Sequence, residues 1–167
     1  MKQILFALIT FCLSYLPSMA QDKILLGEIS KSDLQQAPFS TWYEEYENGY
    51  QVDAASIEGL QDLLKGVEIK IGMGTWCHDS KREVPRFYKI LDQAGINLEQ
   101  TKMYGLDRKK QSDNSEAISM QVQNTASIVF YKNGIEMNRI VERPVVSLEK
   151  DMMTILRGEK YRHSKMP

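Results

Sequence analysis

The chain has 167 residues, of which 21 are lysine or arginine and 22 are aspartate or glutamate, so its formal net charge is −1. This balance, without a basic stripe or a phosphate-cradling glycine loop, argues against nucleic acids and other polyanions as partners. Only two cysteines are present, so an internal disulfide framework is not expected to hold the fold together.

The amino terminus, residues 1–20, has the layout of a secretory signal peptide. Lys2 precedes an apolar run over residues 4–16, and small residues occupy the −3 and −1 positions of a cut before Gln21. The alternative is an uncleaved anchor helix, but the run is shorter than the roughly 18 residues that a spanning helix needs. We therefore expect a periplasmic or secreted protein that starts near Gln21, has lost Cys12 and has no other membrane segment.

Residues 21–65 predict a helical N-terminal extension that packs on the main domain. Ser32 and Gln35 have the spacing of a capping box at the start of a helix. The segment 53–66 places apolar residues on one helical stripe that ends at a glycine. The stripe consists of Ile57, Leu60, Leu63 and Leu64. The aromatic residues of the extension are expected to pack, although they are also able to line a binding face: Trp42, Tyr43, Tyr46 and Tyr50.

Residues 66–157 predict one α/β domain, because segments of period-two and period-3.6 apolar patterning alternate along them. Asn133 and Gly134 form a strong hairpin signal, and Ser147 is expected to cap the last helix. The tail at 158–167 is polar and is expected to be loose. We expect strands at 67–73, 101–106, 127–132 and 136–141, and helices at 80–94, 115–123 and 147–156.

The motif "GTWC" at residues 74–77 lies between the first of these strands and the helix that follows it. A cysteine just before a helix lies near the positive end of the helix dipole, which favours the thiolate over the thiol. His78 adds a positive charge when it is protonated, and Asp79 opposes that effect. The competing interpretation is that Cys77 is a small buried hydrophobic residue.

The "GTWC" turn, the hairpin "FYKNG" and the last helix together resemble the thioredoxin-like superfamily, in particular secreted thioredoxin-like proteins of Bacteroidetes-type bacteria. The resemblance covers about residues 67–156. It implies a thioredoxin-like fold, with a central mixed sheet flanked by helices, and Cys77 at the carboxyl end of the strand at 67–73. It also implies that Cys77 is the nucleophile and that Trp76 covers one side of the thiol and shapes a docking surface.

Four positions depart from the active pattern of that family. Ser80 replaces the resolving cysteine, so one chain cannot close a disulfide there, although the hydroxyl is able to bind a thiolate. Ile71 stands where thioredoxins bury a carboxylate, and Glu142 stands where they usually keep a glycine. Ala126 takes the place of the cis-proline. Because a cis bond before a non-proline residue costs about 2.5–4 kcal/mol, we expect the Thr125–Ala126 bond to be trans or strained.

Two functions of different classes remain open. In the first, Cys77 attacks a disulfide or thiol adduct on a client protein or a low-molecular-weight thiol, and an external thiol releases the product. Ser80 assists there, and Trp76, His78, Thr125 and Ala126 contact the substrate. In the second, the domain has lost redox chemistry and binds or assembles with a partner through its aromatic extension and the groove beside the cysteine.

Other chemistries are less well supported. A cysteine hydrolase needs a histidine base, but His78 is adjacent in sequence and awkwardly oriented, and His163 lies in the tail. A peroxidase of the peroxiredoxin type needs a threonine where Gly74 stands. We expect no cofactor and no metal, because Cys77 and His78 are too few ligands within one chain. Only a pair of thiols across a dimer would provide a metal or cluster site.

Overall fold

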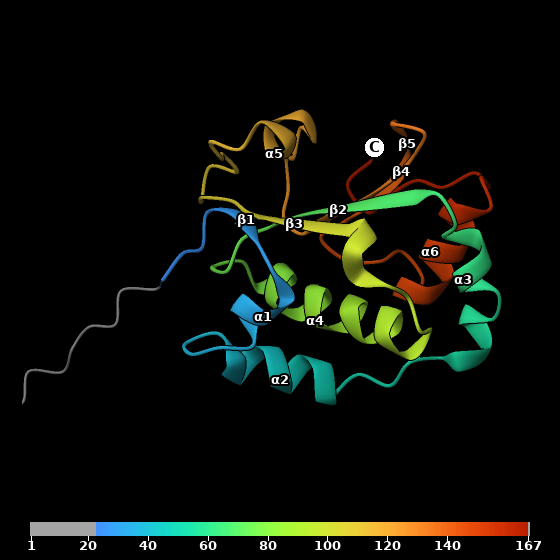
Figure 1. The fold of residues 1–167 in the computed structure, drawn as a ribbon, viewed down its shortest axis with the longest axis horizontal. Coiled ribbons are helices and arrows are strands. Elements are labelled where there is room, and N and C mark those ends of the chain that lie inside the picture. Colours follow the sequence, from blue (N-terminus) through green and yellow to red (C-terminus); the bar gives the residue numbers. More distant parts are fainter. Residues whose placement is uncertain (1–22, 167) are drawn as a thin grey trace, which may run out of the picture.

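The computed structural model describes residues 23–166 (Figure 1). The signal peptide that we predict over residues 1–20 lies outside the described residues. Within the described part of the chain, no helix is both long enough and apolar enough to cross a bilayer.

The protein is an α/β structure built on one mixed sheet of five strands in the order β1-β3-β2-β4-β5. The pair β2 and β3 is parallel, and every other pair is antiparallel. The segments 67–73 and 127–132, both predicted as strands of the central sheet, pair directly, from Val67 opposite Lys132 to Gly72 opposite Ser127. The strands are β1 (Gly27–Ile29), β2 (Val67–Met73), β3 (Thr101–Gly105), β4 (Ser127–Lys132) and β5 (Ile135–Val141).

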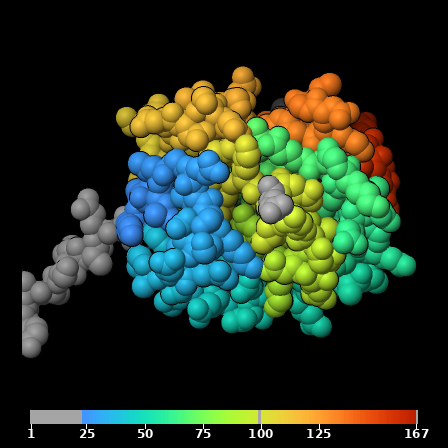
Figure 2. Space-filling model, viewed as in Figure 1, coloured from blue at the N-terminus to red at the C-terminus, as the bar shows by residue number. Residues whose placement is uncertain are grey.

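Strand β1 is the one strand that the sequence analysis does not predict, and it brings the N-terminal extension into the sheet. It pairs with β3, so that Gly27 lies opposite Gly105. A Cβ atom at Gly105 would lie 2.2 Å from the carbonyl oxygen of Leu25, so the close approach of this segment requires glycine there. Figure 2 shows the N-terminal segment, in blue, against the gold surface of the residues that follow β3.

One face of the sheet carries the main core and most of the helices (Figure 1). Alternate residues of β2 point into this core, as the period-two pattern predicts, and Phe87 packs edge-on against Phe130 with ring centroids 6.3 Å apart. Helix α2 packs on α4, on the side of α4 that faces away from the sheet. The helices on this side are α1 (Lys31–Leu34), α2 (Ser40–Asn48), α3 (Leu60–Leu63), α4 (His78–Gln93) and α6 (Leu148–Leu156).

The capping box of the extension is formed by Ser30 and Asp33, which corrects the prediction of Ser32 and Gln35. Ser30 Oγ accepts from the Asp33 N–H at 3.2 Å, and Asp33 Oδ2 accepts from the Ser30 N–H at 2.8 Å. The box is displaced because Ser30 directly follows β1 and still has an extended backbone, which is the conformation that an N-cap residue needs. At the last helix, Ser147 caps α6 as predicted, by accepting from the Lys150 N–H.

The helix predicted over 53–66 is divided into two short pieces, a 3₁₀ helix at Ala54–Ile57 and α3. The division occurs at Gly59, whose φ of 78° lies in the left-handed region, where a right-handed helix cannot continue. The apolar stripe still enters the main core. Three members of the stripe are buried there, namely Ile57, Leu60 and Leu64. The fourth, Leu63, is partly buried.

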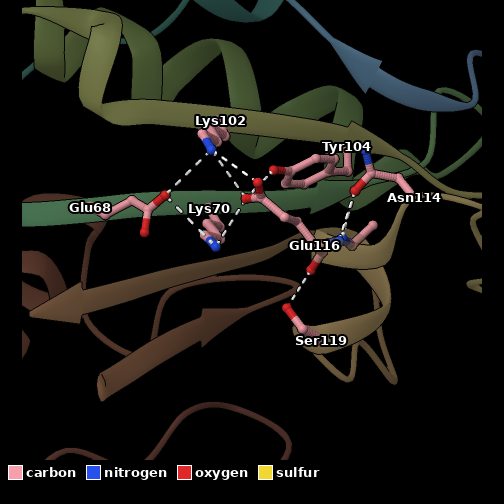
Figure 3. Close-up of polar contacts among 8 residues, drawn as sticks. Glu68, Lys70, Lys102, Tyr104, Asn114, Glu116 and Ser119 are labelled. Carbon is pink, nitrogen blue, oxygen red and sulfur yellow. Dashed lines mark hydrogen bonds and ion pairs between the residues drawn. The ribbon is translucent and has the colours of Figure 1, made fainter. Parts of the chain in front are cut away.

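The opposite face of the sheet carries a second, smaller core under α5 (Ser115–Ser119). This helix is shorter than the predicted 115–123, because Gln121 has a φ of 50° and leaves the helical region. The rest of this face holds a polar cluster centred on Glu116 (Figure 3). Its carboxylate accepts from the Tyr104 hydroxyl at 2.8 Å and pairs with Lys70 and Lys102, each at 3.1 Å.

The C-terminal tail, which we expected to be loose, is tied to the edge strand β5. The Asn138 side chain donates to the Tyr161 carbonyl at 3.2 Å, and the Ser164 hydroxyl donates to the Val141 carbonyl at 2.6 Å. A tail that satisfies groups on an edge strand also protects that edge from pairing with another chain. Its polar composition thus serves hydrogen bonding to β5.

Leu60 tests whether the extension contributes to the stability of the domain. It is fully buried in the main core, so Leu60→Ala should lower the free energy of unfolding by about 2–5 kcal/mol. The measurement is the urea unfolding curve, with the exposed neighbour Gln61→Ala as the matched control. An unchanged midpoint for Leu60→Ala would show that the extension is peripheral to the fold.

Glu116 gives the stability a pH dependence. Hydrogen bonds from the tyrosine and then from the two lysines lower the pKa of Glu116 from its ordinary 4.5 to about 2. Because the folded pKa lies below the unfolded one, ionised Glu116 stabilises the fold fully above about pH 4.5, and this contribution is lost as the pH falls toward 2. Glu116→Gln should therefore lower the urea midpoint at neutral pH, and the difference from wild type should shrink below pH 4.5.

The control for this pH series is Glu44→Gln, which removes an exposed carboxylate of α2. That variant should follow the wild-type curve across the whole pH range. If the deficit of Glu116→Gln is the same at neutral pH and well below pH 4.5, the carboxylate does not contribute through its charge.

Candidate functional site

The candidate site is built on the turn between β2 and α4, residues 74–77. The Cys77 N–H donates to the Gly74 carbonyl at 2.9 Å, and the Cys77 carbonyl accepts from the Lys81 N–H at 3.0 Å. Cys77 is thus the N-cap residue of α4, with an extended backbone at φ −88° and ψ 127°. A Cβ atom at Gly74 would lie 2.5 Å from the Trp76 ring, so the indole requires glycine at the start of this turn.

The thiol of Cys77 is partly exposed, and it faces the chain just before β4. Sγ lies 3.1 Å from the Thr125 carbonyl oxygen, to which the S–H donates. Two of the predicted site residues, Cys77 and Thr125, therefore meet in space, although they are 48 residues apart in sequence.

The Thr125–Ala126 peptide bond is cis, where the sequence predicted a bond that is trans or strained. The sequence argument considered only the local preference of this bond. In the fold, the carbonyl groups on both sides have tertiary partners: Thr125 accepts from the thiol, and Ala126 accepts from the Glu142 N–H at 2.7 Å. The Glu142 side chain pairs in turn with Lys165 of the tail, also at 2.7 Å.

Ser80 is fully buried and supports the turn. Its Oγ accepts a hydrogen bond from the Gly74 N–H at 3.2 Å. This contact joins the first turn of α4 to the end of β2, so the side chain at the resolving position helps to place the thiol. Ile71 is fully buried in the apolar core, which agrees with the absence of a carboxylate at that position.

His78 and Asp79 both interact with Arg82, a residue that the sequence analysis did not select. The Asp79 carboxylate pairs with Arg82 at 2.7 Å, so its charge is compensated locally. The His78 ring lies edge-on to Tyr46 of α2, with Nε2 3.4 Å from the hydroxyl, and its Nδ1 is 3.5 Å from the guanidinium of Arg82. Arg82 follows Asp79 by three residues and His78 by four. On a helix this spacing brings side chains together, so it is the sequence signal that would have indicated Arg82.

Trp76 contacts the loop after β3. Its Nε1 donates to the Leu106 carbonyl at 2.9 Å. The Arg108 guanidinium lies 5.4 Å from the centre of the indole, and the Lys110 ammonium lies 5.8 Å from it. Both distances are in the range of cation–π contacts. The sequence does carry a signal for this surface, namely the three consecutive basic residues at 108–110. The sequence analysis looked for a longer basic stripe and did not use this shorter run.

Two further features bear on the other chemistries considered, namely metal-ligand groups and His163. Between residues 23 and 166, no group of three histidine, cysteine, aspartate or glutamate side chains is placed to hold a metal ion. His163 lies beside Arg139 and Asn124 in a small cavity of about 80 Å³, and its Nδ1 accepts from the Lys165 N–H. Burial there lowers the pKa of His163 below its ordinary 6.5, and the nearby Arg139 lowers it further.

Comparison with protein-family models, curated proteins and solved structures gave no match to this chain. Its function is therefore inferred from the residues around Cys77 and from their geometry.

The contact between Ser80 and Gly74 can be tested through stability. Ser80→Ala leaves the buried Gly74 N–H without its partner, which should cost about 1–3 kcal/mol in the free energy of unfolding. Urea unfolding measures this loss, with Thr41→Ala on the exposed surface of α2 as the control. Equal stability of Ser80→Ala and wild type would mean that the hydroxyl does not hold the turn.

Proposed function

We propose that this protein is a thioredoxin-like protein of the cell envelope that exchanges disulfides through a single thiol, Cys77. The observation that carries this proposal is the position of Cys77. It is a partly exposed cysteine at the start of a 16-residue helix, in the short turn that follows the central strand β2. The unpaired N–H groups and the dipole at such a helix start favour the thiolate, which is the nucleophile of disulfide exchange.

The reaction has two steps that balance without a cofactor. The Cys77 thiolate attacks one sulfur of a client disulfide, the client S–S bond breaks, and the second client sulfur leaves as a thiolate. An external thiolate then attacks the client sulfur of the mixed disulfide, the bond between that sulfur and Cys77 breaks, and Cys77 leaves as a thiolate while the client sulfur stays bonded to the external thiol. Ser80 has no sulfur and is engaged with the Gly74 N–H, so the release has to come from outside the chain.

The walls around Cys77 are suited to a docked client. Trp76 precedes Cys77 in sequence and contacts the loop after β3. His78 follows Cys77 and contacts helix α2. The Thr125 carbonyl faces the thiol from the chain before β4. A bound disulfide has to replace the contact between the thiol and Thr125, and loss of the thiol proton removes that hydrogen bond in the same step. Client proteins and low-molecular-weight thiols both fit this scheme.

The alternative is a redox-inactive module that binds or assembles with a partner, and the same hydrogen bond is the observation that favours it. In the resting structure the S–H donates to Thr125, and a bond of this kind is available only to the protonated thiol. The Ala126 carbonyl is also occupied, by the Glu142 N–H. Alkylation of Cys77 as a function of pH separates the two functions, because slow labelling that rises only near an ordinary thiol pKa of about 8.5 favours the binding module.

Covalent capture of clients is the direct test of the proposal. In a dithiol site the second thiol resolves the mixed disulfide internally, at a high effective concentration. Because Ser80 cannot do this, complexes of clients with Cys77 should accumulate in an oxidising extract. They should appear on non-reducing gels, disappear with reductant and be absent from Cys77→Ser.

Two variants complete this test. Ser80→Cys should shorten the lifetime of the complexes, because a second thiol is then available at the buried position. Ser119→Cys in the Cys77→Ser background places a single cysteine on the exposed end of α5, and it should not capture the same clients. Capture by the Ser119 variant equal to that by Cys77 would contradict a specific function for the turn.

A further inference from the structure

Glu142, the residue that follows β5, has a backbone conformation that its residue type disfavours. Its φ of 60° lies in the left-handed region, which residues other than glycine rarely adopt. Its N–H donates to the Ala126 carbonyl at 2.7 Å, and its carboxylate pairs with Lys165 at 2.7 Å. The N–H of the next residue, Arg143, donates to the Val141 carbonyl at 2.8 Å. A strained residue that several contacts hold in place next to a reactive group is a candidate for a functional role.

The Glu142 N–H is connected to the thiol through neighbouring carbonyl groups. Ala126 directly follows Thr125, whose carbonyl oxygen lies 3.1 Å from Cys77 Sγ and accepts from the S–H. Thr125 and Ala126 are 3% and 2% exposed, so water is a poor substitute for these hydrogen bonds. The bond from Glu142 to Ala126 therefore helps to fix the carbonyl that accepts from the thiol.

The C-terminal tail completes this series of contacts. The Ser164 hydroxyl donates to the carbonyl of the last residue of β5 at 2.6 Å, and the next residue, Lys165, pairs with Glu142. Upstream in the tail, the Tyr161 hydroxyl donates to the buried carboxylate of Asp151 at 2.8 Å. The end of the chain thus lies beside β5 (Figure 1).

We propose that Glu142 is a positioning residue for Cys77, and that Lys165 of the tail holds it in place. With the pair formed, the Thr125 carbonyl stays where it accepts from the S–H, a bond that only the protonated thiol makes. With the pair broken, this carbonyl is less firmly held and the thiolate forms more readily. The tail is therefore a latch that keeps the thiol at rest. The inference rests on the proposed disulfide exchange for its meaning and adds regulation to it, whereas its test measures the thiol directly.

Charged side chains on other elements next to the turn also act on the thiol, so the test has to separate the position of Glu142 from its charge. The segment 121–127, which carries the Thr125 carbonyl, contains no charged residue. The charged or titratable residues of the adjoining elements are Lys23 before β1, His78, Asp79, Lys81 and Arg82 on α4, Arg108 and Lys110 after β3, Glu142 and Arg143 after β5, and Lys165 in the tail.

The opposite charges of Glu142 and Lys165 allow this separation. Glu142→Gln and Lys165→Gln both break the pair, so both should raise the rate at which the Cys77 sulfur displaces iodide from iodoacetamide at neutral pH. The expected increase is about two- to fivefold, which is the range of a partly exposed ion pair. A direct effect of charge would move the two rates in opposite directions, because loss of an anion favours the thiolate and loss of a cation disfavours it.

Two further variants serve as controls. The exchanged pair, Glu142→Lys with Lys165→Glu, restores the contact and should return the alkylation rate toward that of wild type. Lys160→Gln removes the same charge from an exposed position of the tail and should leave the rate unchanged. At about pH 10, above the ordinary thiol pKa of about 8.5, the rates of all variants should converge, because the thiol is then ionised in each of them.

The outcomes distinguish this proposal from the proposed function. Rates that move in opposite directions, that equal wild type in both single variants, or that rise as much in Lys160→Gln would overturn the latch and leave disulfide exchange intact. A difference that persists at about pH 10 would also overturn it, since access to the sulfur would then have changed instead of its ionisation. The expected order of rates without any capture of clients would overturn disulfide exchange and leave Glu142 as a positioning residue. Lys165 is half-exposed, so Lys165→Gln keeps the test available if Glu142→Gln does not fold.

Discussion

The hydrogen bond from the Gly74 N–H to Ser80 Oγ is the contact on which the geometry of the site depends. It joins the end of a central strand to the first turn of α4 inside a region that excludes water, where an unpaired N–H would be costly. Gly74 also leaves the space that the Trp76 indole fills. One glycine and one serine thereby fix both the thiol at the start of the helix and the direction of the tryptophan.

This arrangement gives Ser80 a different meaning from the one suggested by its position. A serine in place of a resolving cysteine indicates the loss of a chemical step. In the fold, the same side chain has acquired a structural contact that a thiol, a weaker hydrogen-bonding group, would not reproduce well. The Ser80 hydroxyl therefore helps to hold the turn that carries Cys77.

The site also draws on parts of the chain that are remote from the turn. The N-terminal extension contributes Tyr46, which contacts His78, and a segment whose Leu25 N–H donates to the Thr75 hydroxyl at 3.3 Å. The tail contributes Lys165, which pairs with Glu142 beside Ala126. Both ends of the described chain thus converge on the residues that surround Cys77. An isolated domain cut at residue 66 would lack part of its own site.

The sequence by itself determined the elements whose signal is local. Alternating apolar residues identified β2, the turn Asn133-Gly134 identified the hairpin, and Ser147 identified the start of α6, because periodicity, turn preference and capping act over a few residues. The lone thiol and the apolar Ile71 were equally visible. These features require no knowledge of distant contacts.

Only the tertiary structure decided the features that depend on partners far along the chain. Three of these features join segments that are tens of residues apart: the pairing of β1 with β3, the contact between Cys77 and Thr125, and the position of Arg108 over Trp76. The fourth is the cis bond at Ala126, which lies next to one of these contacts. Local preference opposed the cis bond and gave no signal for β1. Such features depend on packing and hydrogen bonds between segments that only the fold brings together, so no pattern within a few residues encodes them.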